Sequence, residues 1–447
     1  MHYTESLFEK IKVLEDTPGT NDKLALVSFF DPQERRLAAM AVDPSISFFL
    51  SKVPVHGIEG TDPWDEKIDQ LLQDLAKRTL TGNRARDEIV AQLSRLNRPA
   101  RELACRVLLK DLKCKVGVTL INKAFPGTIV EYPYMRCSLP DKSNMPKWTA
   151  TEWENGMLSQ LKADGMFASL TTTNDGVRLV SRQGSPFPAD TLADLHKVHG
   201  ELIGSQVHGE LLVYRGGELL ERQISNGILN SLLQGGELET TDTVAYVAWD
   251  IIPIEDAVPG GTCRTPYLQR LANLREAVET HPIIDVIETR VVHSKDAAYD
   301  HYFEILGRGM EGTIIKHPEG IWKDTTSKDC VKLKLEVDVE LRFKGFTPGS
   351  GKNADTFGSV TMVSEDDLLE VDVAGWTDAA RADLWARRDN LSEAICTVRS
   401  NQILKPSPSN EKYSLFLPRI VEERKDKRVA DTLQQIKDQF AAAVAKK

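Results

Sequence analysis

The sequence lacks the features that would place it in a membrane, a secreted scaffold or a zinc ribbon. It contains six cysteines but no Cys-x-x-Cys pair, so we expect reduced thiols rather than a metal ribbon or a disulfide framework. No run of about 18 apolar residues occurs, and the first residues lack the basic-then-apolar order of a signal peptide. Internal repeats and low-complexity segments are also missing. We therefore expect a cytoplasmic protein with no membrane partner.

The chain is long enough for several ordinary domains. At 447 residues, and with about 150 residues per domain, the length predicts roughly three. Hydrophobic residues make up 41% of the sequence and charged residues 27%, which is typical of a folded soluble protein. A monomer is the expected state.

The net charge of −10 conceals a basic segment, residues 77–123. This segment holds twelve Lys or Arg residues and four Asp or Glu residues, which favours a phosphate-binding face. A solvated helical surface would give the same pattern, because charge runs usually face water. The cations that we expect on the phosphate-binding face are Arg84, Arg86, Arg95, Arg98 and Lys113.

Residues 1–128 are predicted to form an all-α domain. Asp-Pro pairs at Asp31, Asp43 and Asp62 each place a capping side chain before a proline, which is a signature of a helix start. After the third pair, apolar residues recur with helical spacing from Ile68 to Leu75, and Gly82 is the expected stop. A further helix is expected over 99–112, inside the basic segment.

The remaining chain is predicted to be rich in strands. Residues 129–336 alternate short β-rich runs with turns, and two helices, over 267–279 and 297–307, interrupt them. Residues 337–447 contain shorter strands at a spacing that fits a small barrel, followed by a last amphipathic helix from Leu433 to Val444. The expected fold class is therefore multidomain α+β with antiparallel sheets.

Lys162 lies on a polar turn between two predicted strands, and we interpret it as a covalent nucleophile. An amine attacks only when it loses its proton, which requires burial or neighbouring positive charge. Lys332 and Lys334 are two residues apart on a predicted strand, so both point to one face and could bind an anion. An ordinary surface lysine on an Asp-Gly turn, and lysines that guard a sheet edge, are the plain alternatives.

Two carboxylates and one aromatic residue complete the candidate site. Glu210 and Glu311 each stand next to a glycine on an apolar strand, where a charge is costly unless it is paired or binds a metal. Magnesium together with phosphates explains both. Trp249 offers a flat surface that could cover a base, although a buried tryptophan is more often core.

Six short motifs, taken in order, resemble those of the covalent nucleotidyltransferases. They are Lys162-Ala163-Asp164-Gly165, Ser181-Arg182-Gln183-Gly184, His208-Gly209-Glu210, Trp249-Asp250, Glu311-Gly312-Thr313-Ile314-Ile315-Lys316 and Lys332-Leu333-Lys334. Near the end, Arg424-Lys425-Asp426-Lys427 resembles the Arg-x-Asp-Lys motif of ATP-dependent DNA ligases. The chain is most similar to the T-even bacteriophage type of these ligases, over essentially its whole length.

The resemblance implies a domain order and a three-step reaction. Residues 1–128 would bind DNA, residues 129–336 would form the nucleotidyltransferase (adenylation) domain, and residues 337–447 would form an OB-fold with a C-terminal helix. Lys162 would take AMP from ATP, pass it to the 5′-phosphate of a nick in duplex DNA, and the 3′-hydroxyl would displace it. Such ligases serve DNA replication, repair and recombination, in the host cell if the source is viral.

The resemblance also implies roles for single residues, with ATP and Mg²⁺ as cofactors. Glu210 and Glu311 would bind the metal, and Lys332 and Lys334 would grip the α-phosphate. The residues that would contact other parts of the nucleotide are Gln160 and Leu161 beside the nucleophile, Arg182 and Glu210 at the ribose, Trp249 at the adenine, and Arg424 and Lys427 at the departing pyrophosphate.

Two positions depart from the family pattern, and two other functions share parts of it. Phe167 stands where an arginine is common, and Gln160 stands where a glutamate often reads adenine. An RNA ligase or an mRNA-capping guanylyltransferase shares the lysine motif, but the basic helical segment and the Arg424-to-Lys427 segment argue against both. A non-catalytic clamp on nicked DNA would need a disabled motif, and none is found.

Overall fold

The computed structural model describes residues 2–445 except 51, 55–59, 190–191, 199, 282, 350–352, 392–393 and 408–409. The chain divides into two compact units, which are treated separately below. The first unit comprises residues 1–136, 163–288 and 317–327, and the second comprises 137–162, 289–316 and 328–447. Together they form a multidomain α+β protein, as predicted.

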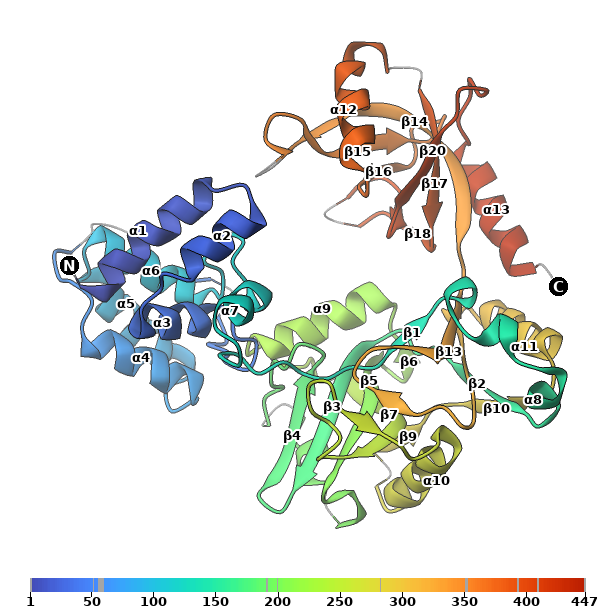
Figure 1. The fold of residues 1–447 in the computed structure, drawn as a ribbon, viewed down its shortest axis with the longest axis horizontal. Helices are drawn as coiled ribbons and strands as arrows, with labels where there is room; N and C mark the ends of the chain where they lie inside the picture. The colour runs from blue at the N-terminus through green and yellow to red at the C-terminus, as the bar shows by residue number, and fades with distance from the viewer. Residues whose placement is uncertain are drawn as a thin grey trace. The chain divides into compact units, whose positions relative to one another are not determined.

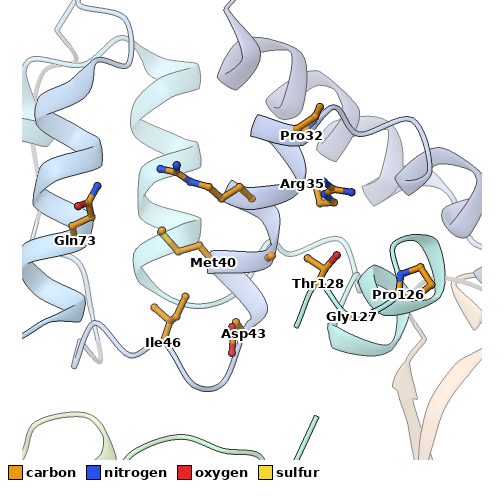
Figure 2. Close-up of a pocket in the computed structure, with 11 residues that line it drawn as sticks. Pro32, Arg35, Met40, Asp43, Ile46, Gln73, Pro126, Gly127 and Thr128 are labelled. Atoms are coloured by element: carbon orange, nitrogen blue, oxygen red, sulfur yellow. The ribbon is translucent and has the colours of Figure 1, made fainter. Parts of the chain in front are cut away.

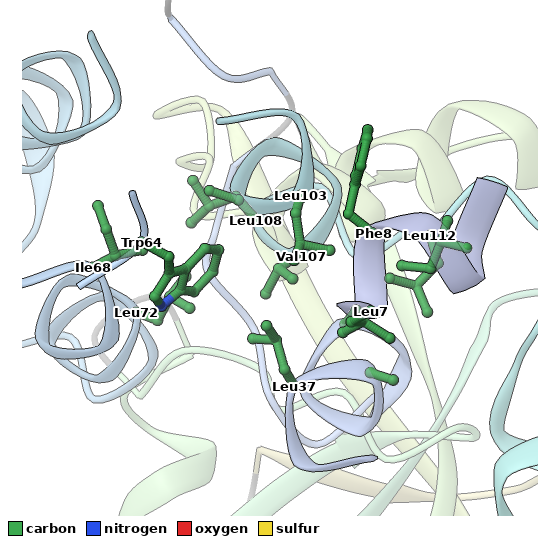
Figure 3. Packing of buried hydrophobic residues seen from close by; sticks show 14 of the residues in the cluster. Leu7, Phe8, Leu37, Trp64, Ile68, Leu72, Leu103, Val107, Leu108 and Leu112 are labelled. Atoms are coloured by element: carbon green, nitrogen blue, oxygen red, sulfur yellow. The ribbon is translucent and has the colours of Figure 1, made fainter. Parts of the chain in front are cut away.

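The first unit begins with an all-α segment, which confirms the prediction for residues up to about 128 (Figure 1). Leucine and other apolar side chains from its helices form one buried cluster, in which the predicted stripe from Ile68 to Leu75 is at most 3% exposed (Figure 3). Its helices are α1 (Tyr3–Asp16), α2 (Thr20–Val27), α3 (Pro32–Val42), α4 (Glu66–Ala76), α5 (Gly82–Ser94), α6 (Arg98–Leu108) and α7 (Val118–Ala124).

Only the first of the three predicted Asp-Pro helix starts is correct. Asp31 caps α3 through a reciprocal capping box with Glu34. Asp43 instead ends α3, and Asp62 pairs through its backbone with the residues that follow α5, so neither begins a helix. Asp65 caps α4 in place of Asp62. Gly82, expected to stop a helix, is the first residue of α5.

The first unit also contains a large sheet with strand order β4-β3-β5-β7-β9, in which β6 pairs with β5. Its pairs are antiparallel except for β7 and β9, which are parallel. Helices α9 (Arg222–Leu233), which the sequence analysis missed, and α10 (Tyr267–Val278) accompany it. The strands are β3 (Met166–Thr173), β4 (Gly176–Ser181), β5 (Ser205–Arg215), β6 (Glu218–Leu219), β7 (Asp242–Pro253) and β9 (Ile284–Val286), with β8 (Thr262–Cys263) and β12 (Trp322–Lys323) forming a separate pair.

The sheet that carries Lys162 has the order β1-β13-β11-β2-β10. One of its faces packs against α11 (Lys295–Gly307) through a buried cluster that includes Met157, Tyr302 and Leu333. Its strands are β1 (Arg136–Ser138), β2 (Met157–Leu161), β10 (Thr289–Val292), β11 (Gly312–Lys316) and β13 (Thr326–Lys334), and the short helix α8 (Ala150–Glu154) precedes β2.

The C-terminal part of the second unit has a sheet of order β16-β15-β14-β17-β20. The prediction of a closed barrel is wrong for this sheet, because among the described residues its edge strands meet only at an isolated bridge between Ala374 and Arg419. Helix α12 (Asp378–Ala386), also missed, separates β16 from β17 along the chain, and α13 (Leu433–Ala445) confirms the last predicted helix. The strands are β14 (Val337–Pro348), β15 (Phe357–Val363), β16 (Glu370–Val373), β17 (Ile395–Ser400) and β20 (Arg419–Glu423), and β18 (Gln402–Leu404) pairs with β19 (Ser414–Phe416).

Candidate active site

Lys162 follows the last residue of β2, as predicted. Its backbone N–H donates to the carbonyl of Gly312 at 2.9 Å, so the main chain is still held against β11 at this point. The Lys162 side chain is 21% exposed and forms an ion pair with the carboxylate of Glu311. The candidate nucleophile is therefore half-buried, and its amine is paired with the predicted metal ligand.

Glycine at position 312 explains how Glu311 can stand at the start of a buried strand. Gly312 has a φ of +141°, a conformation that other residues rarely adopt, and a Cβ there would lie 2.2 Å from the carbonyl oxygen of Leu333. β11 can thus approach β13 closely only with glycine at this position. The backbone that positions Glu311 beside Lys162 depends on it.

Strand register places four lysines on one face of this sheet. Gly312 lies opposite Lys334 and beside Lys162, and Ile314 lies opposite Lys332. Residues directly opposite each other share a face, and alternate residues along a strand do too. We call the set Lys162, Lys316, Lys332 and Lys334 the lysine face.

The opposite face of the sheet is apolar, as predicted for β13. Val331 and Leu333 are buried, and Ser159 accepts or donates a hydrogen bond at 2.7 Å with His301 of α11. The prediction that Lys332 and Lys334 share a face is confirmed by this alternation. Lys316, only 5% exposed, also lies on the lysine face, although the sequence motif gave it no role. Counting alternate residues from Gly312 along the strand would have predicted this position.

Two lysines of the lysine face form ion pairs with glutamates. Glu311 pairs with Lys162, and Glu336 pairs with Lys334 at 3.1 Å. The neighbouring thiol of Cys137 has its pKa lowered to about 7, first by a hydrogen bond with Cys330 and then by the lysines at 316, 162 and 332. Four lysines gathered on one sheet face make this face suited to a polyphosphate.

Gln160, expected to read adenine, is nearly buried on β2. Its side chain lies on the same strand face as Lys162, is 1% exposed as a residue, and donates from Nε2 to Thr289 Oγ1 at 3.0 Å. The amide is therefore fixed in orientation by the adjacent strand β10. Leu161 pairs with Thr313 of β11.

In the first unit, the residues after Lys162 are held by two polar contacts. The backbone N–H of Gly165 donates to Glu210 Oε2 at 3.2 Å, and Asp164 pairs with Arg222 of α9 at 2.6 Å. A Cβ on Gly165 would lie 2.3 Å from the carbonyl oxygen of Leu211, so this turn also requires glycine. Glu210 thus supports the turn in addition to its predicted role at ribose or metal.

An aromatic group lies around Phe167 on the large sheet of the first unit. The ring of Phe167 is 4.8 Å from Tyr134 and 6.0 Å from Trp249, measured between centroids. The guanidinium of Arg182 lies over Tyr134 at 4.2 Å. Arg182 and Trp249, predicted to contact the nucleotide, are therefore joined through Tyr134 and Phe167.

The aspartate of the Trp249-Asp250 motif has a structural task. Asp250 forms a two-pronged ion pair with Arg270 of α10 at 2.7 Å and 3.0 Å, and both side chains are at most 2% exposed. The carbonyl of Trp249 accepts a hydrogen bond from Tyr267 at 2.7 Å. These contacts fix β7 to α10 and so fix the backbone that carries Trp249.

In the second unit, Arg424 and Lys427 share one carboxylate. Arg424 Nη1 lies 2.6 Å from Glu340 Oε1, and Lys427 Nζ lies 3.4 Å from the same oxygen. Arg424 also forms a two-pronged pair with Asp426 at 2.9 Å and 2.7 Å. The structure thus brings the two predicted pyrophosphate ligands together.

The cations of the basic segment divide into exposed and structural ones. Arg84, Arg86, Arg98 and Lys113 are exposed. Arg95 is instead held by Asp65 at 2.5 Å and Asp62 at 3.4 Å, in the loop before α4. It was predicted as a phosphate contact, and its guanidinium already serves two carboxylates.

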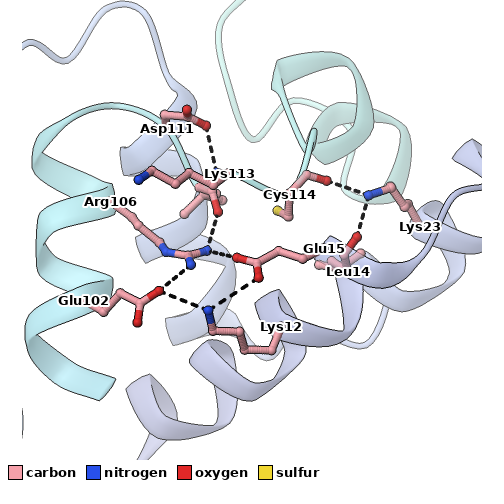
Figure 4. Close-up of polar contacts among 10 residues, drawn as sticks. Lys12, Leu14, Glu15, Lys23, Glu102, Arg106, Asp111, Lys113 and Cys114 are labelled. Carbon is pink, nitrogen blue, oxygen red and sulfur yellow. Dashed lines mark hydrogen bonds and ion pairs between the residues drawn. The ribbon is translucent and has the colours of Figure 1, made fainter. Parts of the chain in front are cut away.

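Arg106, also in the basic segment, is the buried centre of a polar cluster whose other charged members are partly exposed (Figure 4). Arg106 is 5% exposed and forms ion pairs with Glu15 and Glu102. The distance to Glu102 is 2.5 Å, and Arg106 also donates a hydrogen bond to the carbonyl of Leu112 at 2.8 Å. Lys12 binds the same two glutamates, at 3.4 Å and 3.0 Å. The twelve cations of the segment therefore overstate its free positive charge.

The helical part of the first unit contains a cavity of about 810 Å³ (Figure 2). Arg35, Arg36 and Gln73 contribute polar atoms, and Met40 and Ile46 contribute apolar ones. Arg35 also lies over the ring of Phe125 at 4.8 Å.

The donor set for a metal is small. Within the part of the chain that the structure describes, no three His, Cys, Asp or Glu side chains are grouped so that they could hold an ion. Mg²⁺ usually binds through one or two carboxylates together with substrate phosphates. The partly exposed Glu311 carboxylate fits that mode, whereas a closed protein cage would not be expected here.

Among the described residues, no helix is both long and apolar enough to cross a bilayer.

Comparisons with known proteins point to one family. Residues 142–334 match the family described as ATP dependent DNA ligase domain. The DNA ligases of Enterobacteria phages T4 and T6 are each 26% identical to this chain over 457 aligned residues, which cover 91% of this chain and 92% of theirs. The solved structure named Pmar-Lig_Pre. has a similar fold, with a TM-score of 0.61 and 22% identity over 94% of this chain and 99% of its own.

Proposed function

We propose that this chain, which is an ATP-dependent DNA ligase, forms its covalent AMP intermediate on Lys162. The lysine face is the observation that carries the proposal. It places a half-buried primary amine at a strand end, next to Glu311 and on the same sheet face as three other lysines. A nucleophile for a polyphosphate needs both a positioned amine and cations for the substrate's charge.

The reaction has three displacements at phosphorus. The Lys162 amine attacks the α-phosphorus of ATP, an N–P bond forms, and pyrophosphate leaves. An oxygen of the 5′-phosphate at the nick then attacks the same phosphorus and releases the lysine. Finally the 3′-hydroxyl attacks the 5′-phosphate, a phosphodiester forms, and AMP leaves. Reactions of this kind depend mainly on positioning and on charge neutralisation.

The residues of the lysine face would perform the first step. Lys332 and Lys334 would bind the α-phosphate, whose developing negative charge they neutralise. Glu311 stabilises the Lys162 ammonium while the two are paired. Either this ion pair must weaken or the Glu311 carboxylate must accept the proton before the amine attacks. Mg²⁺, when bound at Glu311 and Glu210, would neutralise phosphate charge.

The nucleotide contacts stay proposals that rest on the motifs. Trp249 would cover the adenine, Arg182 and Glu210 would hold the ribose, and the backbone at Leu161 with the Gln160 amide would border the base. The aromatic group around Phe167 supports the proposal for Trp249 and Arg182, because it joins the two side chains. Arg424 and Lys427 would orient the pyrophosphate.

The domain assignment follows the secondary structure. We propose a DNA-binding domain over 1–128, an adenylation domain over 129–336 and an OB-fold over 337–447. The last sheet has five strands and is antiparallel throughout, as in the partly open five-stranded sheet of an OB-fold, and this supports the third. Exposed Arg84, Arg86 and Arg98 would contact phosphates of the nicked duplex. The ligase would act as a monomer in the cytoplasm.

A comparison of nucleotides and nicked duplexes tests the proposed ligase activity. The protein is incubated with Mg²⁺, either ATP or GTP, and a labelled nicked duplex made of DNA or of RNA. We expect sealed DNA strands with ATP and little product with GTP or with the RNA duplex. Preference for GTP would instead support a capping guanylyltransferase, and preference for nicked RNA an RNA ligase. Binding of nicked DNA without sealing would leave only a clamp.

A further inference from the structure

Glu340 is a buried carboxylate that the first step of the proposed reaction leaves without a task. It lies on β14, and its side chain is 10% exposed. Arg424 Nη1 and Lys427 Nζ both contact its Oε1, at 2.6 Å and 3.4 Å. We propose that Glu340 is a positioning residue, which holds Arg424 and Lys427 as one unit for the pyrophosphate part of ATP. This inference rests on the proposed role of these two cations.

The carboxylate is itself fixed from the other side. Thr397 lies opposite Glu340 in the β14–β17 pair, and its hydroxyl is 3.1 Å and 3.2 Å from the two carboxylate oxygens. The backbone N–H of Glu340 donates to Asp431 Oδ2 at 2.7 Å, and the backbone N–H of Asp431 donates back to the Glu340 carbonyl at 2.8 Å. The Glu340 carboxylate is therefore held in place from one side, and it can position the side chains of Arg424 and Lys427 on the other.

Both cations remain open to a substrate while they are held. The side chains of Arg424 and Lys427 are 24% and 39% exposed, whereas the shared carboxylate lies beneath them. Two cations that meet at one oxygen repel each other, and the negative charge between them offsets that repulsion. Without it, Asp426 would still hold Arg424, but the carboxylate that joins Lys427 to Arg424 in the described structure would be gone, so a pyrophosphate would have to bring the two cations together.

The arrangement predicts opposite effects on binding and on rate. Glu340→Gln keeps the shape of the side chain but removes the negative charge that competes with pyrophosphate for the cations. We expect the KM for ATP in self-adenylation to stay within about twofold or to fall, because attraction is not reduced. We expect kcat to fall about 10- to 30-fold, because the cations are no longer aligned in the transition state.

Three measurements make up the test. They are kcat and KM for self-adenylation, the rate of sealing of pre-adenylated nicked DNA, and the urea midpoint of unfolding. Sealing should change less than about threefold, because pyrophosphate takes part only in the first step. Asp338→Asn is the matched control on the same strand, since Asp338 pairs with Arg399 and contacts neither cation in the described structure. The control should leave both rates unchanged.

Thr397→Val keeps the test valid if Glu340→Gln unfolds. It removes only the hydroxyl that orients the carboxylate, and it should give a smaller loss of kcat with KM unchanged. Adding Glu340→Gln to Arg424→Ala should cost little beyond Arg424→Ala alone, because the two residues act as a unit.

The outcomes separate the two hypotheses. If Arg424→Ala and Lys427→Ala both leave self-adenylation intact, the proposed role of these cations fails. If they impair it but Glu340→Gln leaves kcat unchanged or raises it, only the positioning role of Glu340 is contradicted. A loss of sealing equal to the loss of self-adenylation also contradicts it.

Discussion

Lys162 and Arg106 are both cations that contact glutamate, but their surroundings differ. Arg106 is 5% exposed and is met by two glutamates and a backbone carbonyl, so its charge is satisfied within the helical segment. Lys162 has Glu311 as its carboxylate partner, is 21% exposed, and shares a sheet face with three further lysines. A buried cation between carboxylates holds a fold together, whereas several lysines on one sheet face are suited to binding a phosphate.

Glu311→Gln should have the largest effect, because it changes the carboxylate partner of Lys162 at the candidate active site. We expect the rate of self-adenylation to fall about 10²- to 10³-fold, because the carboxylate proposed to hold Mg²⁺ at the phosphates would be lost, and this is the scale typical of losing one electrostatic interaction in the transition state. The free energy of unfolding should change by less than about 1 kcal/mol, because the ion pair is partly exposed. Single-turnover labelling with α-labelled ATP measures the rate.

Glu336→Gln is the matched control for Glu311. Glu336 pairs with Lys334 and Arg419 but not with Lys162. We expect a loss of less than about tenfold. A Glu311→Gln protein that labels as fast as the wild type would show that Glu311 is only a surface partner of Lys162.

Arg106→Met should destabilise the helical segment without changing the candidate active site. Removing the buried Arg106 should cost about 2 kcal/mol of unfolding free energy, because Glu15, Glu102 and the Leu112 carbonyl lose its hydrogen bonds, and only the more exposed Lys12 still pairs with the two glutamates. Urea denaturation followed by circular dichroism measures this change. Self-adenylation under conditions where the protein stays folded should be unaffected.

Lys12→Met separates burial from pairing at the same two glutamates. Lys12 is 40% exposed, so its loss should cost about 0.5 kcal/mol. Equal losses for Lys12 and Arg106 would contradict the view that burial makes Arg106 structural.

Sequence patterns predicted elements better than partners. The alternation in Val331-Lys332-Leu333-Lys334 placed the two lysines on one face correctly, because side-chain direction in a strand is a local property. The helix starts at Asp43 and Asp62 were wrong, because the backbone of Asp62 is used by Leu96 and its neighbours, which are distant in sequence. Local signals cannot show which long-range partner will compete for a cap.

The candidate site shows the same limit. Lys162 and Glu311 were both identified from their motifs, but their direct ion pair depends on the register of β2 with β11. Arg95 was predicted as a phosphate contact, and Arg106 was counted among the cations of the basic segment, because a charge count cannot show that Asp65 or Glu15 lies beside them. Glu340 carried no signal at all, since its meaning comes from Arg424, far along the chain.

The exposed cations sharpen the comparison within the basic segment. Changing Arg84, Arg86, Arg98 and Lys113 to Gln should weaken binding of nicked DNA about 10- to 100-fold and flatten its salt dependence, by about 0.9 in log–log slope for each phosphate that is no longer neutralised. Arg95→Gln should leave the slope unchanged, because Arg95 is held by Asp62 and Asp65. Fluorescence anisotropy at several salt concentrations measures both, and an unchanged affinity for the fourfold variant would contradict the exposed basic face.

Cys137 gives the smallest and most local readout of the lysine face. The hydrogen bond with Cys330 and the nearby lysines lower its pKa to about 7, so the thiolate fraction should rise as the pH rises through 7 rather than through 9. The alkylation rate of Cys137 should follow this rise, as mass spectrometry of the peptide can show. Cys330→Ala removes that hydrogen bond and should move the midpoint upward. A midpoint near 9 in the wild type would mean that neither the Cys330 hydrogen bond nor the lysines lower the pKa of this thiol.

The most direct test of the account is where AMP becomes attached. The protein is incubated with α-labelled ATP and Mg²⁺, denatured, and digested, and the labelled peptide is sequenced by mass spectrometry. The account predicts one acid-labile N–P adduct, on the peptide that contains Lys162, and none in Lys162→Arg. An adduct on another lysine, or undiminished labelling of Lys162→Arg, would contradict it.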